Sequence, residues 1–276
     1  MGREVWFSEW QTDDVKLSLR VKAVLWEEKT PYQELLVVDT DAYGRVLILD
    51  GAIQTTERDE FVYHEMIAHV PLSIHPRPRR VAVIGGGDGG AIREILKHPE
   101  VEEAHLVEID ERVIAASRRF FPAIAAGLDD PRVTIHVTDG IRWVAEEARD
   151  FDVIIVDSTD PVGPAENLFG EPFYRSVAAA LGPDGILVAQ SESPLLEPEL
   201  VRRVQRGLRA VFPVVSLYTA AVATYPTGLW TFGFGSKGPR PPRPRPDVAR
   251  FATRYWTPAV QEAAFVLPPM VEELTR

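Results

Sequence analysis

The chain has 276 residues, no cysteine and a formal net charge of −11, with 41 acidic residues against 30 lysines and arginines. Its length fits one large domain, or one domain with a small annex, and its composition is that of an ordinary globular protein. Because cysteine is absent, disulfides, thiolate nucleophiles and cysteine–zinc sites are excluded. The acidic balance argues against nucleic acid or an anionic membrane as a partner and suits a cationic small molecule.

The N-terminal region contains no apolar signal core, and no apolar run in the sequence is long enough to span a bilayer, so we expect a cytoplasmic protein. Apolar and polar residues alternate over residues 17–25 and 32–39, which is the period of a strand with one buried face. Turn signals at 39–44 and 50–51 separate these segments from two return strands. We assign residues 1–58 to a small N-terminal antiparallel β domain that forms a lid or wall on a larger body.

A helix is predicted from Glu60 to about His69, and Pro71 is expected to end it. His64 and His69 in this helix mimic the paired histidines of zinc proteases. Those histidines are four residues apart on one helix face, whereas a separation of five places them about 140° apart around the axis. A metal site is therefore not expected here, and Tyr63 and His64 remain candidates for a ligand crevice.

Strands and helices alternate from residue 79 onward, within a domain that we assign to residues 59–237. Strands are predicted at 81–84, 103–108, 133–138, 152–157, 185–190, 214–219 and 230–234. Helices are predicted at about 89–97, 111–120, 141–148, 171–181 and 197–212. This alternation predicts an α/β fold with a doubly wound, mostly parallel sheet and a ligand crevice outside the carboxyl ends of its strands.

The last segment, residues 238–276, is predicted to pack on this domain. It begins with alternating proline and arginine at 238–246, which favours an extended, solvated tether over a recognition motif. Two short helices are expected at about 258–265 and 269–274, separated by the proline pair that ends at Pro269.

A glycine-rich loop at 85–90 follows the first strand of the alternating region. Gly85, Gly87 and Gly90 satisfy the G-x-G-x-x-G spacing, in which backbone N–H groups and a helix N-terminus face a ligand. Asp88 lies in the middle of the loop, where its carboxylate would repel a pyrophosphate. The loop therefore favours a ligand that carries a positive charge.

Acidic residues stand at the ends of four consecutive strands: Asp88, Glu108, Asp139 and Asp157, with Asp160 close behind. One such acid is often a helix cap, but four around one crevice would repel one another unless a cation lay among them. Glu108 lies about 20 residues beyond the glycine loop, at the position that binds ribose hydroxyls. Asp139 and Gly140 are placed to accept from a purine amine. The pattern predicts an adenosine ligand with a cationic tail, together with a second, polycationic substrate.

Four segments together carry a family resemblance: the glycine loop, Val-Glu-Ile-Asp at 107–110, Asp-Ser-Thr-Asp-Pro at 157–161 and residues 49–64. They resemble the corresponding segments of the polyamine aminopropyltransferases, specifically the spermidine synthases, and the likeness extends over nearly the whole chain. The resemblance implies a Rossmann-like, methyltransferase-type fold. It also implies transfer of an aminopropyl group from decarboxylated S-adenosylmethionine to putrescine, which gives spermidine and methylthioadenosine. The resemblance implies no metal or cofactor. It implies that the protein assembles as a homodimer or a homotetramer.

The resemblance also implies roles for individual residues, with Asp157 as the general base. The amine-binding positions that it implies are Tyr63, His64, Asp88, Asp160 and Tyr225. The positions implied for the donor nucleoside are Gln33, Gln54, Glu108, Asp139, Gly140 and Pro164, to which the glycine-loop pattern adds Gly85 and Gly87, with Asp88 at the donor's tail.

Elementary chemistry agrees with these roles but leaves the acceptor open. A decarboxylated donor has an ammonium tail that Asp88 attracts, and a protonated amine with a pKa near about 10.4 cannot attack carbon until a base removes its proton. Asp160 or Glu192 could hold the remote ammonium of putrescine, whereas stacking on Trp230 would favour agmatine; we expect Trp230 to be core. Three other classes of protein share parts of this sequence pattern: a methyltransferase, an NAD-dependent oxidoreductase and a non-catalytic polyamine-binding module.

Overall fold

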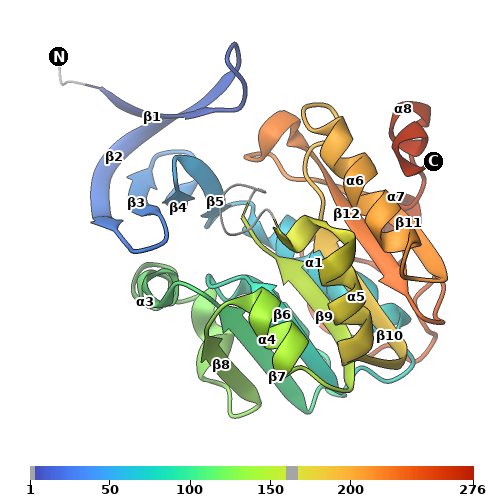
Figure 1. Cartoon of the computed structure of the whole chain (residues 1–276). Helices are drawn as coiled ribbons and strands as arrows, with labels where there is room; N and C mark the ends of the chain where they lie inside the picture. The colour runs from blue at the N-terminus through green and yellow to red at the C-terminus, as the bar shows by residue number, and fades with distance from the viewer. Residues whose placement is uncertain (1–3, 160–166) are drawn as a thin grey trace.

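The structure is a computed structural model that describes residues 4–159 and 167–276. In Figure 1 a small sheet of N-terminal strands stands beside a larger sheet that is flanked by helices. This arrangement confirms the predicted α/β class, with an antiparallel N-terminal sheet and a mostly parallel second sheet. Within the described residues, no helix is long and apolar enough to cross a membrane.

The N-terminal sheet is an antiparallel meander whose strands are hydrogen-bonded in chain order. Its strands are β1 (Val5–Trp10), β2 (Lys16–Lys29), β3 (Glu34–Thr40), β4 (Gly44–Leu49) and β5 (Ala52–Thr56). Asp50 and Gly51, in the turn between β4 and β5, both have positive φ, as Asp-Gly turns require. On one face Leu35 and Leu47 belong to a buried cluster with α3 (Glu111–Phe120), which fixes this sheet as a wall on the larger body.

The larger sheet has seven strands within the described residues, in the order β11-β12-β10-β9-β6-β7-β8. They are β6 (Arg80–Gly85), β7 (Glu103–Glu108), β8 (Val133–Val137), β9 (Phe151–Asp157), β10 (Leu181–Gln190), β11 (Val214–Ala221) and β12 (Leu229–Ser236). Only β12 runs against its neighbours among these strands. The chain order reverses between β6 and β9, and such a reversal opens a ligand crevice at the strand ends.

Helices cover both faces of this sheet. They are α1 (Glu60–Ile74), α2 (Gly90–Ile95), α3, α4 (Gly140–Glu146), α5 (Glu171–Ala180), α6 (Pro198–Arg209), α7 (Pro258–Ala264) and α8 (Pro269–Glu272). Along β6, Val81 and Val83 join the buried cluster of α1 and α2, whereas Ala82 and Ile84 join that of α4, α5 and α6. This alternation places α4, α5 and α6 in front of the sheet and α1 behind it (Figure 1) and confirms the doubly wound layout.

Helix α1 is longer than predicted, because it continues through Pro71 to Ile74. Proline removes one backbone donor from the helix and usually ends it. Here every residue of α1 except Phe61 is buried, so packing on the sheet outweighs the lost hydrogen bond. The local rule that a proline ends a helix was wrong for this central, enclosed element.

The proline–arginine segment at 238–246 contains no helix or strand, as predicted, but it is not a freely solvated tether. The side chain of Arg245 is only 11% exposed and its guanidinium lies 2.8 Å from a carboxylate oxygen of Glu100. Further along, the carboxylate of Glu65 in α1 accepts hydrogen bonds from the backbone N–H groups of residues 254, 255 and 256. These contacts hold the C-terminal segment against the back of the larger sheet.

Candidate active site

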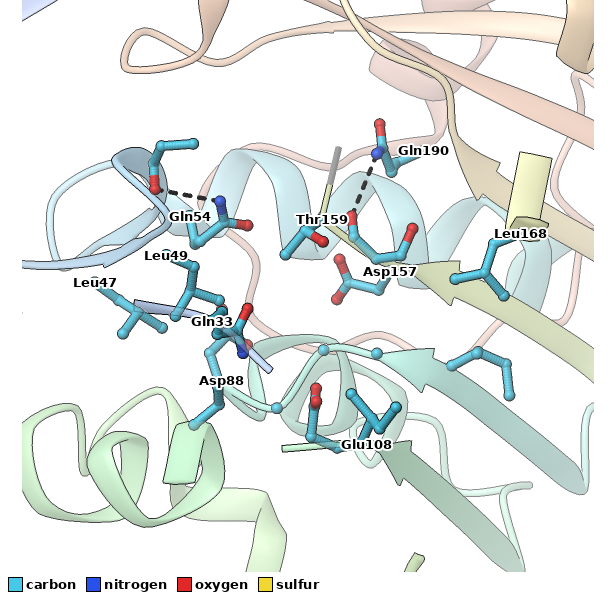
Figure 2. Close-up of a pocket in the computed structure, with 18 of the residues that line it drawn as sticks. Gln33, Leu47, Leu49, Gln54, Asp88, Glu108, Asp157, Thr159, Leu168 and Gln190 are labelled. Carbon is cyan, nitrogen blue, oxygen red and sulfur yellow. Dashed lines mark hydrogen bonds between the residues drawn. The ribbon is translucent and has the colours of Figure 1, made fainter. Parts of the chain in front are cut away.

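A cavity lies between the N-terminal sheet and the carboxyl ends of strands β6 to β9. Twelve of the predicted site residues line it: Gln33, Gln54, Tyr63, His64, Gly85, Gly87, Asp88, Glu108, Asp139, Gly140, Asp157 and Tyr225. Glu192, the alternative to Asp160 for the remote ammonium, is buried and is not one of the lining residues. Asp160 and Pro164 lie outside the described residues. Figure 2 shows Leu47 and Leu49 of the N-terminal sheet on one side of the cavity, and Asp157 and Glu108 at the strand ends on the other.

The glycine loop is pressed between two acidic side chains. Gly85 and Gly86 have φ of +82° and +68°, a conformation that favours glycine. A Cβ on Gly86 would lie 2.8 Å from Oδ2 of Asp157, and one on Gly87 would lie 2.8 Å from Oε2 of Glu108. The loop therefore needs glycine both for its backbone angles and because bare backbone must pass between the two carboxylates.

Asp157 is tuned by its surroundings. The Tyr63 hydroxyl donates a hydrogen bond of 2.6 Å to Oδ1 of Asp157. Burial behind the loop and the nearby charge of Asp88 raise the pKa of Asp157 to about 6, although His64 and the bond from Tyr63 act in the opposite direction. The pKa of Tyr63 is well above its ordinary value, because it is buried beside Asp157, so its hydroxyl stays protonated. Asp157 is thus a carboxylate near neutral pH with an unusually high proton affinity.

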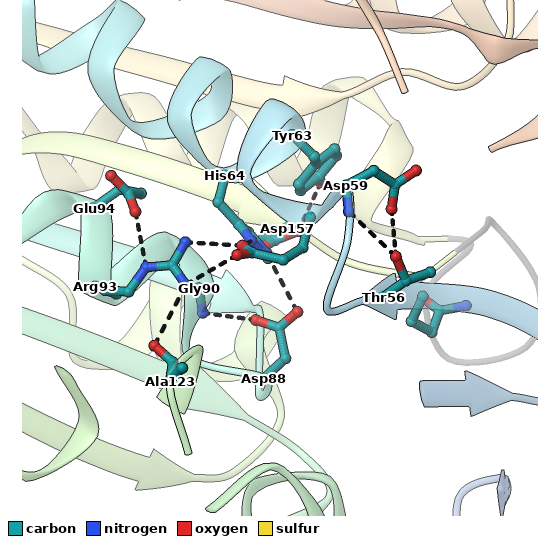
Figure 3. A network of polar contacts seen from close by, with 12 residues as sticks. Thr56, Asp59, Tyr63, His64, Asp88, Gly90, Arg93, Glu94, Ala123 and Asp157 are labelled. Carbon is teal, nitrogen blue, oxygen red and sulfur yellow. Dashed lines mark hydrogen bonds and ion pairs between the residues drawn. The ribbon is translucent and has the colours of Figure 1, made fainter. Parts of the chain in front are cut away.

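Asp88 is held as a carboxylate on the other side of the loop. Burial opposes its ionisation, but the His64 imidazolium and the backbone N–H of Gly90 outweigh burial, and the pKa of Asp88 lies below its ordinary value. The Gly90 N–H donates a 2.7 Å hydrogen bond to Oδ1, and Nε2 of His64 lies 3.2 Å from Oδ2. Figure 3 shows these contacts with the Tyr63–Asp157 pair. The cavity therefore presents two carboxylates with different proton affinities.

The predicted nucleoside residues lie at the ends of the next two strands. Burial raises the pKa of Glu108 to about 7, and its Oε1 accepts a 2.9 Å hydrogen bond from the backbone N–H of Asp110. Asp139 caps α4, because its Oδ1 accepts from the N–H of Ile141 at 2.8 Å. Gln33 donates to Oδ2 of Asp110 at 2.9 Å and so ties the N-terminal domain to this end of the cavity. The capping interpretation is thus correct for Asp139, which nevertheless also faces the cavity.

Three aromatic residues that contact one another line the cavity, and one of them, Tyr63, is hydrogen-bonded to Asp157. The ring of Tyr225 packs edge to face on Tyr63 and on Trp230, with centroid separations of 5.5 and 4.7 Å. The Tyr225 hydroxyl donates a 2.7 Å hydrogen bond to the backbone oxygen of Gln54. Trp230 is buried, as expected of a core residue, but it also lines the cavity. Aromatic side chains from α1, β12 and the loop before β12 therefore form one continuous part of the lining, which we call the end wall.

Several polar residues of the cavity were not predicted as site residues, and Glu9 and Gln190 are two of them. Glu9 of β1 is only 6% exposed, lines the cavity and accepts a hydrogen bond of 3.3 Å from the N–H of Ile53. Gln190 ends β10, and its side-chain amide donates to the backbone oxygen of Ser158 at 3.2 Å. Gln190 could have been found from the sequence, because it stands at the end of the strand that follows β9 and strand ends face the ligand crevice. For Glu9 the sequence offered no signal, because its position depends on how the two sheets dock.

Comparisons with known proteins find similarity along nearly the whole chain. Residues 60–243 match the family model of the spermine/spermidine synthase domain, and residues 5–57 match that of the spermidine synthase tetramerisation domain. The chain is 58% identical to a polyamine aminopropyltransferase of Moorella thermoacetica over 275 residues, covering 98% of this chain and 96% of that protein. It is 50% identical to the polyamine aminopropyltransferase of Bacillus subtilis, covering 99% of both chains.

Solved structures that are similar to this chain are also spermidine synthases. A crystal structure of a spermidine synthase in complex with the transition-state analogue AdoDATO has a TM-score of 0.94 and 38% identity, covering 98% of this chain and 94% of that chain. The spermidine synthase of Thermotoga maritima has a TM-score of 0.90 and 36% identity, with the same two shares of coverage.

Proposed function

The chain belongs to the spermine/spermidine synthase family and is a polyamine aminopropyltransferase, and we propose that it is a spermidine synthase. In this proposal it transfers an aminopropyl group from decarboxylated S-adenosylmethionine to putrescine and releases methylthioadenosine. The observation that carries the proposal is the pair of unlike carboxylates in the cavity: Asp88, held ionised by His64 and the loop, and Asp157, whose pKa is raised to about 6.

The donor is proposed to lie across the carboxyl ends of β6, β7 and β8. Glu108 would accept from the ribose hydroxyls, and the end of β8 at Asp139 and Gly140 would contact the purine. The ammonium tail would then meet Asp88, whose negative charge attracts it and repels the carboxylate of ordinary S-adenosylmethionine. Similarity to the spermidine synthase that binds AdoDATO supports a cavity of this kind.

The acceptor is proposed to react beside Asp157. The carboxylate of Asp157 first takes a proton from the acceptor's ammonium group, which frees the nitrogen lone pair. The nitrogen then forms its bond to the donor carbon next to sulfur, while the carbon–sulfur bond breaks and its electron pair stays on sulfur. The pKa of Asp157, about 6, is closer to the pKa of the amine than the pKa of an ordinary aspartate is, and this smaller difference eases the proton transfer. Holding the amine and the sulfonium-activated carbon in line supplies much of the remaining acceleration, and neither a metal nor a cofactor is needed for the step.

Putrescine is the acceptor that the end wall favours. Tyr63, Tyr225 and Trp230 form a compact aromatic surface that suits a short methylene chain. Glu9 is an acidic residue of the same cavity that could receive the remote ammonium of putrescine. The longer, planar guanidinium group of agmatine would need more room and a bidentate partner. We therefore propose putrescine, with agmatine as the acceptor to be tested against it.

The enzyme is further proposed to act as a homotetramer, because its residues 5–57 match a tetramerisation domain. The strands β1 and β2 expose apolar side chains, among them Trp6 at 53%, Trp10 at 66% and Val24 at 56%. Exposed edges and apolar faces of this kind are the surfaces that a partner subunit covers.

A single assay tests the reaction. The protein is mixed with decarboxylated or ordinary S-adenosylmethionine and with putrescine or agmatine, and methylthioadenosine and the alkylated amine are measured by mass spectrometry. Spermidine and methylthioadenosine from the decarboxylated donor and putrescine are the expected products. A methylated product from ordinary S-adenosylmethionine, or no methylthioadenosine from any pair, would overturn the proposal.

A further inference from the structure

His64 lies between two carboxylates, one inside the cavity and one behind it. Its Nε2 lies 3.2 Å from Oδ2 of Asp88, and its Nδ1 lies 2.6 Å from Oε2 of Glu60, one helical turn earlier in α1. Glu60, His64 and Asp88 are 7%, 3% and 9% exposed, so the three groups interact with little screening by water.

Glu60 is itself clamped from the far side by α2. The two terminal nitrogens of Arg93 donate to the two carboxylate oxygens of Glu60 at 3.1 and 2.8 Å, and Nε of Arg93 donates to Glu94 at 2.8 Å. This forked geometry fixes the plane of the Glu60 carboxylate. Figure 3 shows the resulting chain from Glu94 through Arg93 to His64 and Asp88.

The imidazole ring is also confined by shape. A Cβ added to Gly90 would fall inside the space of the His64 ring, because the first turn of α2 passes against that ring. The N–H of the same glycine donates to Oδ1 of Asp88. Because Gly90 has no side chain, it leaves space for the His64 ring, and its N–H also donates to the Asp88 carboxylate that the ring contacts.

The charged groups around His64 favour its protonated form. Burial lowers the pKa of His64, but the charges and hydrogen bonds of Asp88 and Glu60 outweigh burial and raise it well above its ordinary value. The other titratable groups near the ring are Tyr63, whose ring packs edge to face on it, Asp157 across the loop and Arg93 behind Glu60. As an imidazolium with both N–H groups engaged, His64 has no lone pair with which to accept from an ammonium group.

We infer that Glu60 and His64 are positioning residues, which hold the Asp88 carboxylate in place for the donor's ammonium tail, and that His64 does not itself bind an amine through its ring. This inference rests on the proposed function, because it assigns Asp88 to the tail of the donor. With Gly90 on one oxygen and His64 on the other, the carboxylate of Asp88 is oriented from two sides. Glu60 fixes the orientation and the charge of the His64 ring, and Arg93 fixes the Glu60 carboxylate.

Methylthioadenosine separates positioning from mere stability, because it lacks the ammonium tail. Glu60→Gln should weaken binding of decarboxylated S-adenosylmethionine by roughly tenfold or more, the scale of one lost charge-assisted contact, while methylthioadenosine affinity measured by calorimetry stays near wild type. The His64 pKa, followed by NMR of labelled imidazole, should fall in the same variant. Equal loss of both ligands, or an unchanged donor affinity, would overturn the inference.

Glu65→Gln is the matched control, since Glu65 is a buried glutamate in the same helix whose carboxylate bonds the backbone at residues 254–256. It should change neither the ratio of the two affinities nor the His64 pKa. Arg93→Lys provides a second variant should Glu60→Gln fail to fold. It keeps the positive charge but loses the paired hydrogen bonds to Glu60, so it should weaken binding of the decarboxylated donor and leave binding of methylthioadenosine unchanged. If the wild type transfers aminopropyl groups but neither variant shows donor-selective loss, the positioning role fails while the proposed function stands. If the wild type yields no methylthioadenosine, the function fails, whatever the His64 pKa does.

Discussion

The hydroxyl of Tyr63 donates a 2.6 Å hydrogen bond to Oδ1 of Asp157, and this bond limits how far burial raises the proton affinity of the proposed base. Without it, burial and the charge of Asp88 would act on Asp157 with only His64 to oppose them. Tyr63 remains a donor over the working pH range, because its own pKa is well above the ordinary value. The pair is therefore a fixed donor beside a titrating acceptor.

Asp157→Asn should lower turnover by roughly the 10²–10⁴ that a lost general base costs, with the donor affinity unchanged. The asparagine keeps the shape of the side chain but cannot take the proton from the amine. Because a buried carboxylate with a raised pKa destabilises the folded state above that pKa, the variant should also have an equal or higher melting temperature at pH 8. Steady-state kinetics and calorimetry check the two effects; near-wild-type turnover would remove Asp157 from its role.

The pH dependence of kcat/KM should follow the ionisation of Asp157. Asp157 accepts a proton only as the carboxylate, so activity should be present above its pKa and should fall as pH drops through about 6. Tyr63→Phe removes a bond that lowers this pKa, so the acid limb should move to higher pH. Initial rates between pH 5 and 8, at saturating donor, measure the limb. A limb that stays in place, or moves to lower pH, in Tyr63→Phe would contradict this account.

Asp88→Ala should have two consequences, because Asp88 is proposed to bind the donor's tail and its charge raises the pKa of Asp157. Losing the charge of Asp88 should weaken binding of the decarboxylated donor and abolish discrimination against ordinary S-adenosylmethionine, since one attraction and one repulsion disappear together. It should also lower the pKa of Asp157 and move the acid limb to lower pH, opposite to the effect of Tyr63→Phe. Calorimetry with both donors decides the first point, and an unchanged preference would show that Asp88 does not contact the tail.

The sequence predicted those parts of the fold and site that depend on local pattern. Strand ends carry their acids in fixed order along the chain, so Glu108, Asp139 and Asp157 could be placed at one sheet edge once the alternation of strands and helices was recognised. The glycine loop was visible because backbone that must pass between carboxylates tolerates no side chain. Both features are written in consecutive residues.

Features that arise from packing between distant segments could not be predicted in the same way. Pro71 lies inside α1 because that helix is enclosed on all sides, which no local pattern reports. Glu9 reaches the cavity only when the two sheets dock, and Glu60 meets Arg93 only when α1 packs on α2. In each case the partner lies tens of residues away, and its approach is set by the core.

Light scattering should give the mass of a tetramer at micromolar concentration if β1 and β2 form the subunit contact. Trp6 and Trp10 are more than half exposed on β1, which would leave large apolar side chains in water in a monomer. Replacing both by glutamate should lower the mass by placing charges in the interface. A monomeric wild type would contradict the proposed assembly, and so would a double variant that remains tetrameric.

The end wall should set the choice of acceptor. Trp230→Phe removes one ring of an indole that packs 4.7 Å from Tyr225, so it should enlarge the acceptor end of the cavity and raise the ratio of kcat/KM for agmatine to that for putrescine. The wild type should prefer putrescine, because three aromatic side chains that contact one another line this part of the cavity and suit a short methylene chain.

Trp143→Phe is a fair comparison for this experiment. Trp143 and Trp230 are 3% and 4% exposed, and the indole N–H of each has no hydrogen-bond partner among the described residues. Trp143 packs on His136 of β8 and Phe151 of β9 and does not line the cavity, so its substitution should cost stability of a similar kind without altering the acceptor ratio. If both variants change the ratio equally, loosened packing rather than the wall explains it. A wild type that prefers agmatine would replace the proposed acceptor while leaving aminopropyl transfer in place, because the roles proposed for Asp88 and Asp157 do not depend on which amine reacts.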